Sequence, residues 1–152
     1  MNTVEAVHDI LFSDLETLRA ELLAYPQEDI VWKVLPGTTN SAGVLFVHLT
    51  RSLRHFIGSS FGQSGFLRQR DEEFLVRDIP LADMIAEFDI MIKELKTAFG
   101  NIDPNKLDND FPVSWREGKF YPTHFMLMRM IAHVNYHMGQ VNYHRRFFST
   151  AQ

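Results

Sequence analysis

The chain has 152 residues, a length that suits one domain with a single hydrophobic core, and we expect that domain to cover residues 1–152. Hydrophobic residues make up 45% and charged residues 22%, the balance of an ordinary globular protein. The formal net charge is −4 and no run of Lys and Arg stands out, so a nucleic-acid partner is not expected. The chain has no cysteine, which excludes disulfides, thiolate metal ligands and a cysteine nucleophile.

The N-terminal segment does not have the pattern of a targeting signal. Acidic residues interrupt the first 15 positions, and no basic region precedes a long apolar run. The longest apolar stretch covers only residues 42–47, whereas a membrane span needs roughly 18 residues. With the absence of cysteine, this predicts a cytoplasmic protein that does not interact with a membrane.

Two helices are predicted in the first half of the chain. From Val4 to Leu22 apolar residues recur at steps of three and four, which predicts a helix over about residues 3–24. Residues 25–39 read as a loop. A second helix is predicted over about residues 42–59, with Asn40 or Ser41 as its N-cap.

The second half contains two further predicted helices. Residues 58–79 are polar and irregular, and no element is predicted there. Pro80 fits the first turn of a third helix, which has the clearest apolar stripe and ends at a C-cap formed by Gly100-Asn101. Residues 102–121 form a connection in which 111–115 and 119–121 can pair as a short hairpin. A fourth helix is predicted over about residues 122–148. Four amphipathic helices predict an all-α fold, a four-helix bundle.

Histidine is the residue type most able to carry chemistry in this chain, which has seven of them. His133 and His137 are four residues apart, so they share one face of the fourth helix, at the border of its apolar side. His48 lies among apolar residues in the second helix. Three neutral imidazoles from two helices could hold one metal ion and leave a position open, as catalytic metal sites do. The alternative is that these histidines are hydrogen-bonded core or surface residues.

The remaining features have simpler explanations. His55 and His144 each lie seven residues beyond a candidate ligand, about 10.5 Å along a helix, which is too far to share its metal. We assign no role to His8 or His124. The acidic run at residues 71–73 is interpreted as a solvated loop. Residues 145–146, both arginine, fit either an anionic substrate or a basic helix end.

The chain resembles the DinB/YfiT-like superfamily of metal-dependent enzymes in three places. These are Trp32, the helix entry Asn40-Ser-Ala-Gly-Val-Leu-Phe-Val-His48, and the block His133-Val-Asn-Tyr-His137-Met-Gly-Gln140. The resemblance extends over the order of all four helices. It implies an up-down-down-up four-helix bundle with long crossover connections that pairs as a homodimer. It also implies that His48, His133 and His137 hold one divalent metal ion, for which zinc, nickel and iron are the candidates.

The resemblance does not fix the reaction. Characterised relatives include S-transferases that use low-molecular-weight thiols, and a thiol-dependent isomerase. We expect a metal-dependent thiol S-transferase, because a divalent ion on neutral ligands stabilises a thiolate at neutral pH. Its partners would be small molecules, among them a low-molecular-weight thiol. Residues 58–79 and 102–121 would shape the pocket, and no side chain is assigned as general base. Two alternatives stay open: a metal-dependent hydrolase, and a non-catalytic bundle that acts as a binding or assembly module.

Overall fold

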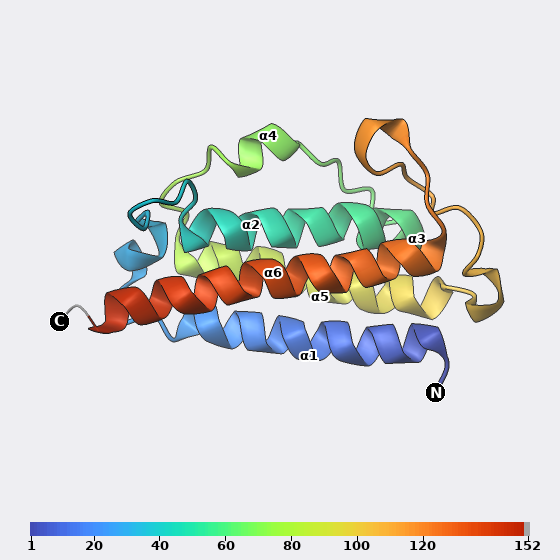
Figure 1. The fold of residues 1–152 in the computed structure, drawn as a ribbon, viewed down its shortest axis with the longest axis horizontal. Helices are drawn as coiled ribbons and strands as arrows, with labels where there is room; N and C mark the ends of the chain where they lie inside the picture. Colours follow the sequence, from blue (N-terminus) through green and yellow to red (C-terminus); the bar gives the residue numbers. More distant parts are fainter. Residues whose placement is uncertain (151–152) are drawn as a thin grey trace.

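The computed structural model describes residues 1–150, whose regular secondary structure is helical and includes no strand. Four long helices pack together: α1 (Thr3–Leu23), α2 (Ala42–Leu53), α5 (Leu81–Asn101) and α6 (Thr123–Thr150). In Figure 1, α1 and α6 run in one direction, and α2 and α5 run in the opposite direction. The all-α prediction is confirmed. No helix in the described range is long and apolar enough to cross a membrane.

The helix starts follow the chemistry of their capping residues. Asn2 caps α1, and the side chain of Glu5 reciprocates by accepting from the backbone N–H of Asn2, which forms a capping box. Ser41 caps α2, because its Oγ accepts from the backbone N–H of Val44 at 3.2 Å. Of the two predicted N-caps, Ser41 is therefore the one used.

The helix ends differ more from the prediction. Helix α2 continues through a π-helical turn (Arg54–Ser59) and a short α3 (Ser60–Gly62), so helical structure extends three residues past the predicted end. Helix α5 includes Gly100 and Asn101, so the predicted C-cap is wrong, and Ile102 takes that place. The last turn of α5 is held because Asn101 donates from its amide to the carbonyl of Phe61 at 2.8 Å.

The connections contain short elements that the sequence did not reveal. Residues 25–39 include a 3-10 helix (Glu28–Trp32). The segment after α3 contains α4 (Arg70–Glu73) and crosses over the outer side of α2 (Figure 1). The suggested hairpin forms only in part: around a turn at Arg116–Gly118, the backbone N–H of Phe111 donates to the carbonyl of Tyr121 and that of Trp115 to the carbonyl of Lys119, both at 2.8 Å, but the two segments do not form regular strands. One isolated bridge between Asp110 and Pro122 remains.

The core positions α2 closely against its neighbours. Eleven of the twelve residues of α2 are buried, and Phe46 stacks on Phe88 of α5 with ring centroids 5.1 Å apart. Gly43 permits the close approach of Trp32: a Cβ at this position would lie 2.8 Å from the indole ring. This packing fixes α2, and with it the position of His48 between α4 and α6.

Candidate metal centre

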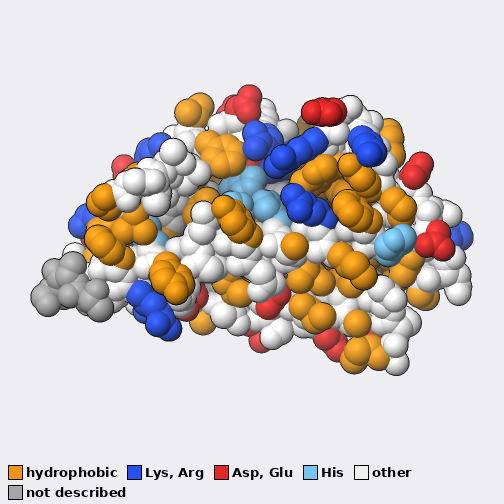
Figure 2. Space-filling view, viewed as in Figure 1, with side chains coloured by type: hydrophobic (Ala, Val, Ile, Leu, Met, Phe, Trp, Pro, Cys, Tyr) orange, Lys and Arg blue, Asp and Glu red, His pale blue; other side chains and the backbone are white. Residues whose placement is uncertain are grey.

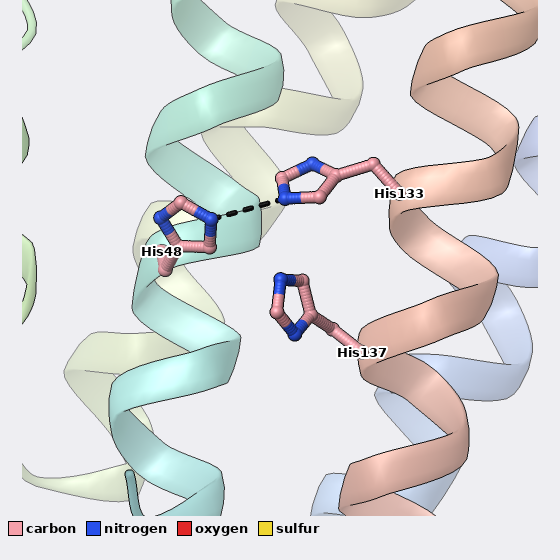
Figure 3. A group of neighbouring side chains, drawn as sticks. All are labelled: His48, His133 and His137. Atoms are coloured by element: carbon pink, nitrogen blue, oxygen red, sulfur yellow. Dashed lines mark hydrogen bonds between the residues drawn. The ribbon is translucent and has the colours of Figure 1, made fainter. Parts of the chain in front are cut away.

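The three candidate histidines converge between α2 and α6. His48 comes from the middle of α2, and His133 and His137 come from successive turns of α6, with all three imidazoles pointing toward one another (Figure 3). One ring nitrogen from each residue lies within 4.8 Å of the others. The Nε2 atoms of His48 and His133 are 3.1 Å apart. The structure therefore brings together the three residues that helical spacing and the resemblance selected.

A buried carboxylate orients His48. Oε2 of Glu73 lies 2.8 Å from Nδ1 of His48, and Glu73 itself is 0% exposed. Arg68 donates two hydrogen bonds to the same carboxylate, at 2.7 and 2.9 Å. Burial acts to raise the pKa of Glu73, but the hydrogen bonds from His48 and Arg68 and the charge of Arg68 outweigh it, so the pKa is lowered. Because an ionised carboxylate only accepts hydrogen bonds, the contact directs Nδ1–H of His48 to Glu73 and leaves Nε2 facing the other histidines.

The position of Glu73 corrects the sequence interpretation. The acidic run at residues 71–73 was expected to be a solvated loop, and Asp71 and Glu72 are indeed exposed. Glu73 is buried instead, because α4 turns its side chain inward toward Arg68 and His48. Sequence spacing carried no signal for this contact, since α4 lies in an irregular segment 25 residues after His48.

The two candidate ligands on α6, His133 and His137, are held in their neutral forms. Burial, reinforced by the neighbouring His137 and His48, lowers the pKa of His133 to about 3. Burial also lowers the pKa of His137. The Nδ1 atom of His137 lies 2.6 Å from Oε1 of Gln140, which leaves Nε2 free to face the centre. The Nδ1 atom of His133 is buried and has no hydrogen-bond partner within residues 1–150.

The geometry of these residues fits a divalent metal ion. Metal ligands must be deprotonated on the coordinating atom, and the low pKa of His133 together with the Nδ1 contacts of His48 and His137 meets that requirement. Two nitrogens bound tetrahedrally to one zinc ion are about 3.3 Å apart, close to the 3.1 Å between His48 and His133. Imidazole nitrogen suits zinc, nickel and iron alike, so the donor set does not select among them.

A cavity of about 730 Å³ opens beside the three histidines. Figure 2 shows a group of histidine side chains near the centre of one face, with Lys or Arg side chains and hydrophobic groups gathered next to it. Both long connections line the cavity, as expected from the sequence: Arg68, Arg70 and Phe74 come from one, and Trp115 and Arg116 from the other. The cavity is large enough for a small molecule.

The other polar residues singled out in the sequence lie outside this cavity. His144 is buried, with Nε2 2.7 Å from the carbonyl of Lys33 and Nδ1 2.8 Å from the hydroxyl of Tyr25, so it is a hydrogen-bonded core histidine. Arg145 pairs with Glu21 at 2.6 Å and does not line the cavity, so the structure gives this arginine no part in binding a substrate there.

These features define an all-helical protein with a histidine group that could hold a metal ion at the wall of a small-molecule cavity. The chain matches the model of the family described as Mycothiol-S-transferase over residues 6–148 and belongs to that family. The family is DinB/YfiT-like, which confirms the resemblance seen in the sequence. No curated protein matches the chain.

Proposed function

We propose that this protein is a metal-dependent thiol S-transferase that joins a low-molecular-weight thiol to an electrophilic small molecule. The observation that carries the proposal is the convergence of three imidazole nitrogens within 4.8 Å at the cavity wall, in a chain of the mycothiol-S-transferase family. His48, His133 and His137 would be the ligands of one divalent ion. The family name makes mycothiol the first thiol to test.

The surrounding side chains prepare the three histidines for this role. Glu73 and Arg68 hold His48 so that Nε2 points to the centre, and Gln140 does the same for His137. Burial keeps His133 and His137 neutral, so no proton has to leave before a cation binds. A divalent ion held there would lower the pKa of a thiol placed beside it.

The reaction also needs a source of sulfur and a place that holds the electrophile. The chain has no cysteine, so the sulfur must come from a cosubstrate. Phe56, Phe74 and Trp115 form apolar walls that would hold the electrophile near the histidines. In the transfer, a sulfur–carbon bond forms, the bond from that carbon to its leaving group breaks, and the thiol proton passes to solvent.

The proposal also covers the domain extent, the helix topology and the cellular compartment of the protein. We propose one domain over residues 1–152, built as an up-down-down-up four-helix bundle and working in the cytoplasm. The opposed directions of the helix pairs α1/α6 and α2/α5 support the bundle, and the absence of cysteine fits the reducing compartment.

We also propose a homodimer that pairs through α6. Exposed apolar or aromatic side chains recur along this helix on one stripe: Phe125, Met128, Tyr136 and Tyr143. Exposed apolar and aromatic side chains that share one side of a helix are typical of an interaction surface. A twofold interface would place the same stripe on both subunits.

The test compares three forms of the protein in one assay. The metal-loaded protein, the metal-depleted protein and the His137→Ala variant are each given mycothiol or another small thiol with 1-chloro-2,4-dinitrobenzene, whose chloride leaves as the thioether forms. We expect thioether formation above the protein-free rate in the loaded protein only, and normal activity in a His124→Ala control. Equal rates in all forms would overturn the proposal. Hydrolysis of an ester without thiol would favour the hydrolase, and no metal binding at all would favour a binding module.

A further inference from the structure

The cavity beside the histidines has a strongly positive lining. Among the described residues, its lining includes four arginines and no Asp or Glu. This is notable in a chain whose formal net charge is −4. Because the four arginines come from segments around residues 68–70, 116 and 129, their gathering is a product of the fold rather than of a basic run in the sequence.

Two of these arginines already have acidic neighbours. Arg68 donates two hydrogen bonds to the buried Glu73. Arg70 lies 4.0 Å from the exposed Asp71. By contrast, Arg116 and Arg129 form no ion pair within 4.0 Å among residues 1–150. Within the described residues, these two guanidinium groups are therefore the positive charges of the cavity that have no carboxylate at ion-pair distance.

Arg116 and Arg129 both lie against the same aromatic ring, that of Trp115. The guanidinium carbons of Arg116 and Arg129 lie 6.0 and 5.7 Å from the centroid of the Trp115 ring. Trp115 is in turn fixed by Phe56, with ring centroids 4.9 Å apart. Cation–π contact restrains a guanidinium group without using its N–H donors, so those donors stay available to a ligand.

From this arrangement we propose that Arg116 and Arg129, held against Trp115, bind a carboxylate on the substrate, so that the preferred substrates are acids. A planar guanidinium group matches a carboxylate through two parallel hydrogen bonds, and a position at the cavity mouth lets the acid dock while the rest of the molecule reaches the histidines. This inference rests on the proposed S-transferase function. The carboxylate could belong to the thiol or to the electrophile, and the experiment separates these two sources.

The probes are three stable thioethers that mimic the product. The first joins 3-mercaptopropionate to N-ethylmaleimide and carries its carboxylate on the thiol half. The second joins 3-mercaptopropanamide to N-(2-carboxyethyl)maleimide and carries it on the electrophile half. The third joins the amide to N-ethylmaleimide and is neutral. Their dissociation constants are measured by calorimetry on metal-depleted and metal-loaded protein, so that binding is read without catalysis.

We expect at least one acidic thioether to bind about tenfold or more tightly than the neutral one, because a charge-assisted hydrogen bond contributes roughly 1.5–3 kcal/mol and 1.4 kcal/mol is tenfold. Arg116→Gln and Arg129→Gln should each remove most of that preference and leave the neutral thioether unaffected. Arg77→Gln is the matched control, since Arg77 donates to the backbone carbonyls of Phe74 and Val76 and does not line the cavity.

The outcomes separate this inference from the function on which it rests. Arginine-dependent preference for an acid in a protein without S-transferase activity would support the carboxylate site and overturn the proposed reaction. S-transferase activity with equal binding of all three thioethers would support the reaction and overturn the carboxylate site. Preference for an acid that persists in both arginine variants would also overturn the assignment to Arg116 and Arg129.

Discussion

Nδ1 of His48 donates a hydrogen bond to Oε2 of Glu73 across 2.8 Å, and this contact joins α2 to the crossover segment that contains α4. Both side chains are buried. The carboxylate fixes the tautomer and the ring orientation of His48, and Arg68 fixes the carboxylate. The crossover segment therefore acts directly on the metal centre that we propose.

Replacing Glu73 by Gln should weaken metal binding. The amide keeps the shape of the side chain but loses the charge that sets the tautomer of His48, and loss of such a partner typically costs 10–100-fold in metal affinity. The measurement is competition for zinc against a chromophoric chelator. Glu72→Gln is the matched control, because Glu72 is exposed one residue away. Wild-type affinity in Glu73→Gln would show that the carboxylate does not support the site.

Removing any one of the three histidines should abolish stoichiometric metal binding. We expect His48→Ala, His133→Ala and His137→Ala to lose the single bound ion, whereas His8→Ala and His124→Ala retain it. Untagged protein is analysed for metal content, and the melting temperature is compared with and without added metal. A bound ion stabilises the folded state by mass action, so only the last two variants should melt higher with metal. Full occupancy in a ligand variant would contradict the assignment.

The low pKa of His133 predicts that the metal-free protein loses stability in mild acid. The unfolded chain takes up a proton on this residue near pH 6.5, whereas the folded chain does so only near its pKa of about 3. The free energy of unfolding should therefore fall as the pH decreases from about 6.5 toward 3. Urea unfolding at pH 7 and pH 5 measures the effect. The fall should be smaller in His133→Gln, and an identical fall would show that His133 does not cause it.

Much of the fold could be predicted from the sequence, because helical periodicity fixes which side chains share a face, and the family resemblance added His48 to the histidine pair of the last helix. Steps of three and four located the long helices, and a spacing of four placed His133 and His137 together. Glu73 and Arg116 could not be predicted in the same way. Both lie in connections whose path depends on tertiary packing, so the sequence contains no periodic signal for what they contact.

The helix ends show the same limit. Gly100-Asn101 has the local pattern of a C-cap, yet α5 continues through both residues, since a contact from Asn101 to Phe61 holds the last turn. The π-helical turn after Leu53 likewise has no counterpart in the apolar pattern. Local signals gave the type of each long element, and packing between elements decided where it ends.

Gly43→Ala should destabilise the protein. The added Cβ would lie 2.8 Å from the ring of Trp32, so either the ring or α2 must move. Overpacking of this kind costs about 1–3 kcal/mol. Gly100→Ala is the matched control, because it is helical with nothing within 4 Å of its added Cβ, and it should stabilise by about 0.5–1 kcal/mol. Urea unfolding measures both, and equal stability of the two variants would contradict the role given to Trp32.

The stripe on α6 predicts the oligomeric state. If two copies pair through it, light scattering should give twice the chain mass of 17.7 kDa at micromolar concentration. Tyr143 is 77% exposed, so Tyr143→Glu should spare the fold but bury a charge in the interface and shift the protein toward monomer. Ile90→Glu, at an exposed apolar position of α5, is the control and should remain dimeric. A wild-type mass of one chain would overturn the homodimer, and a Tyr143→Glu dimer would place the interface on another surface.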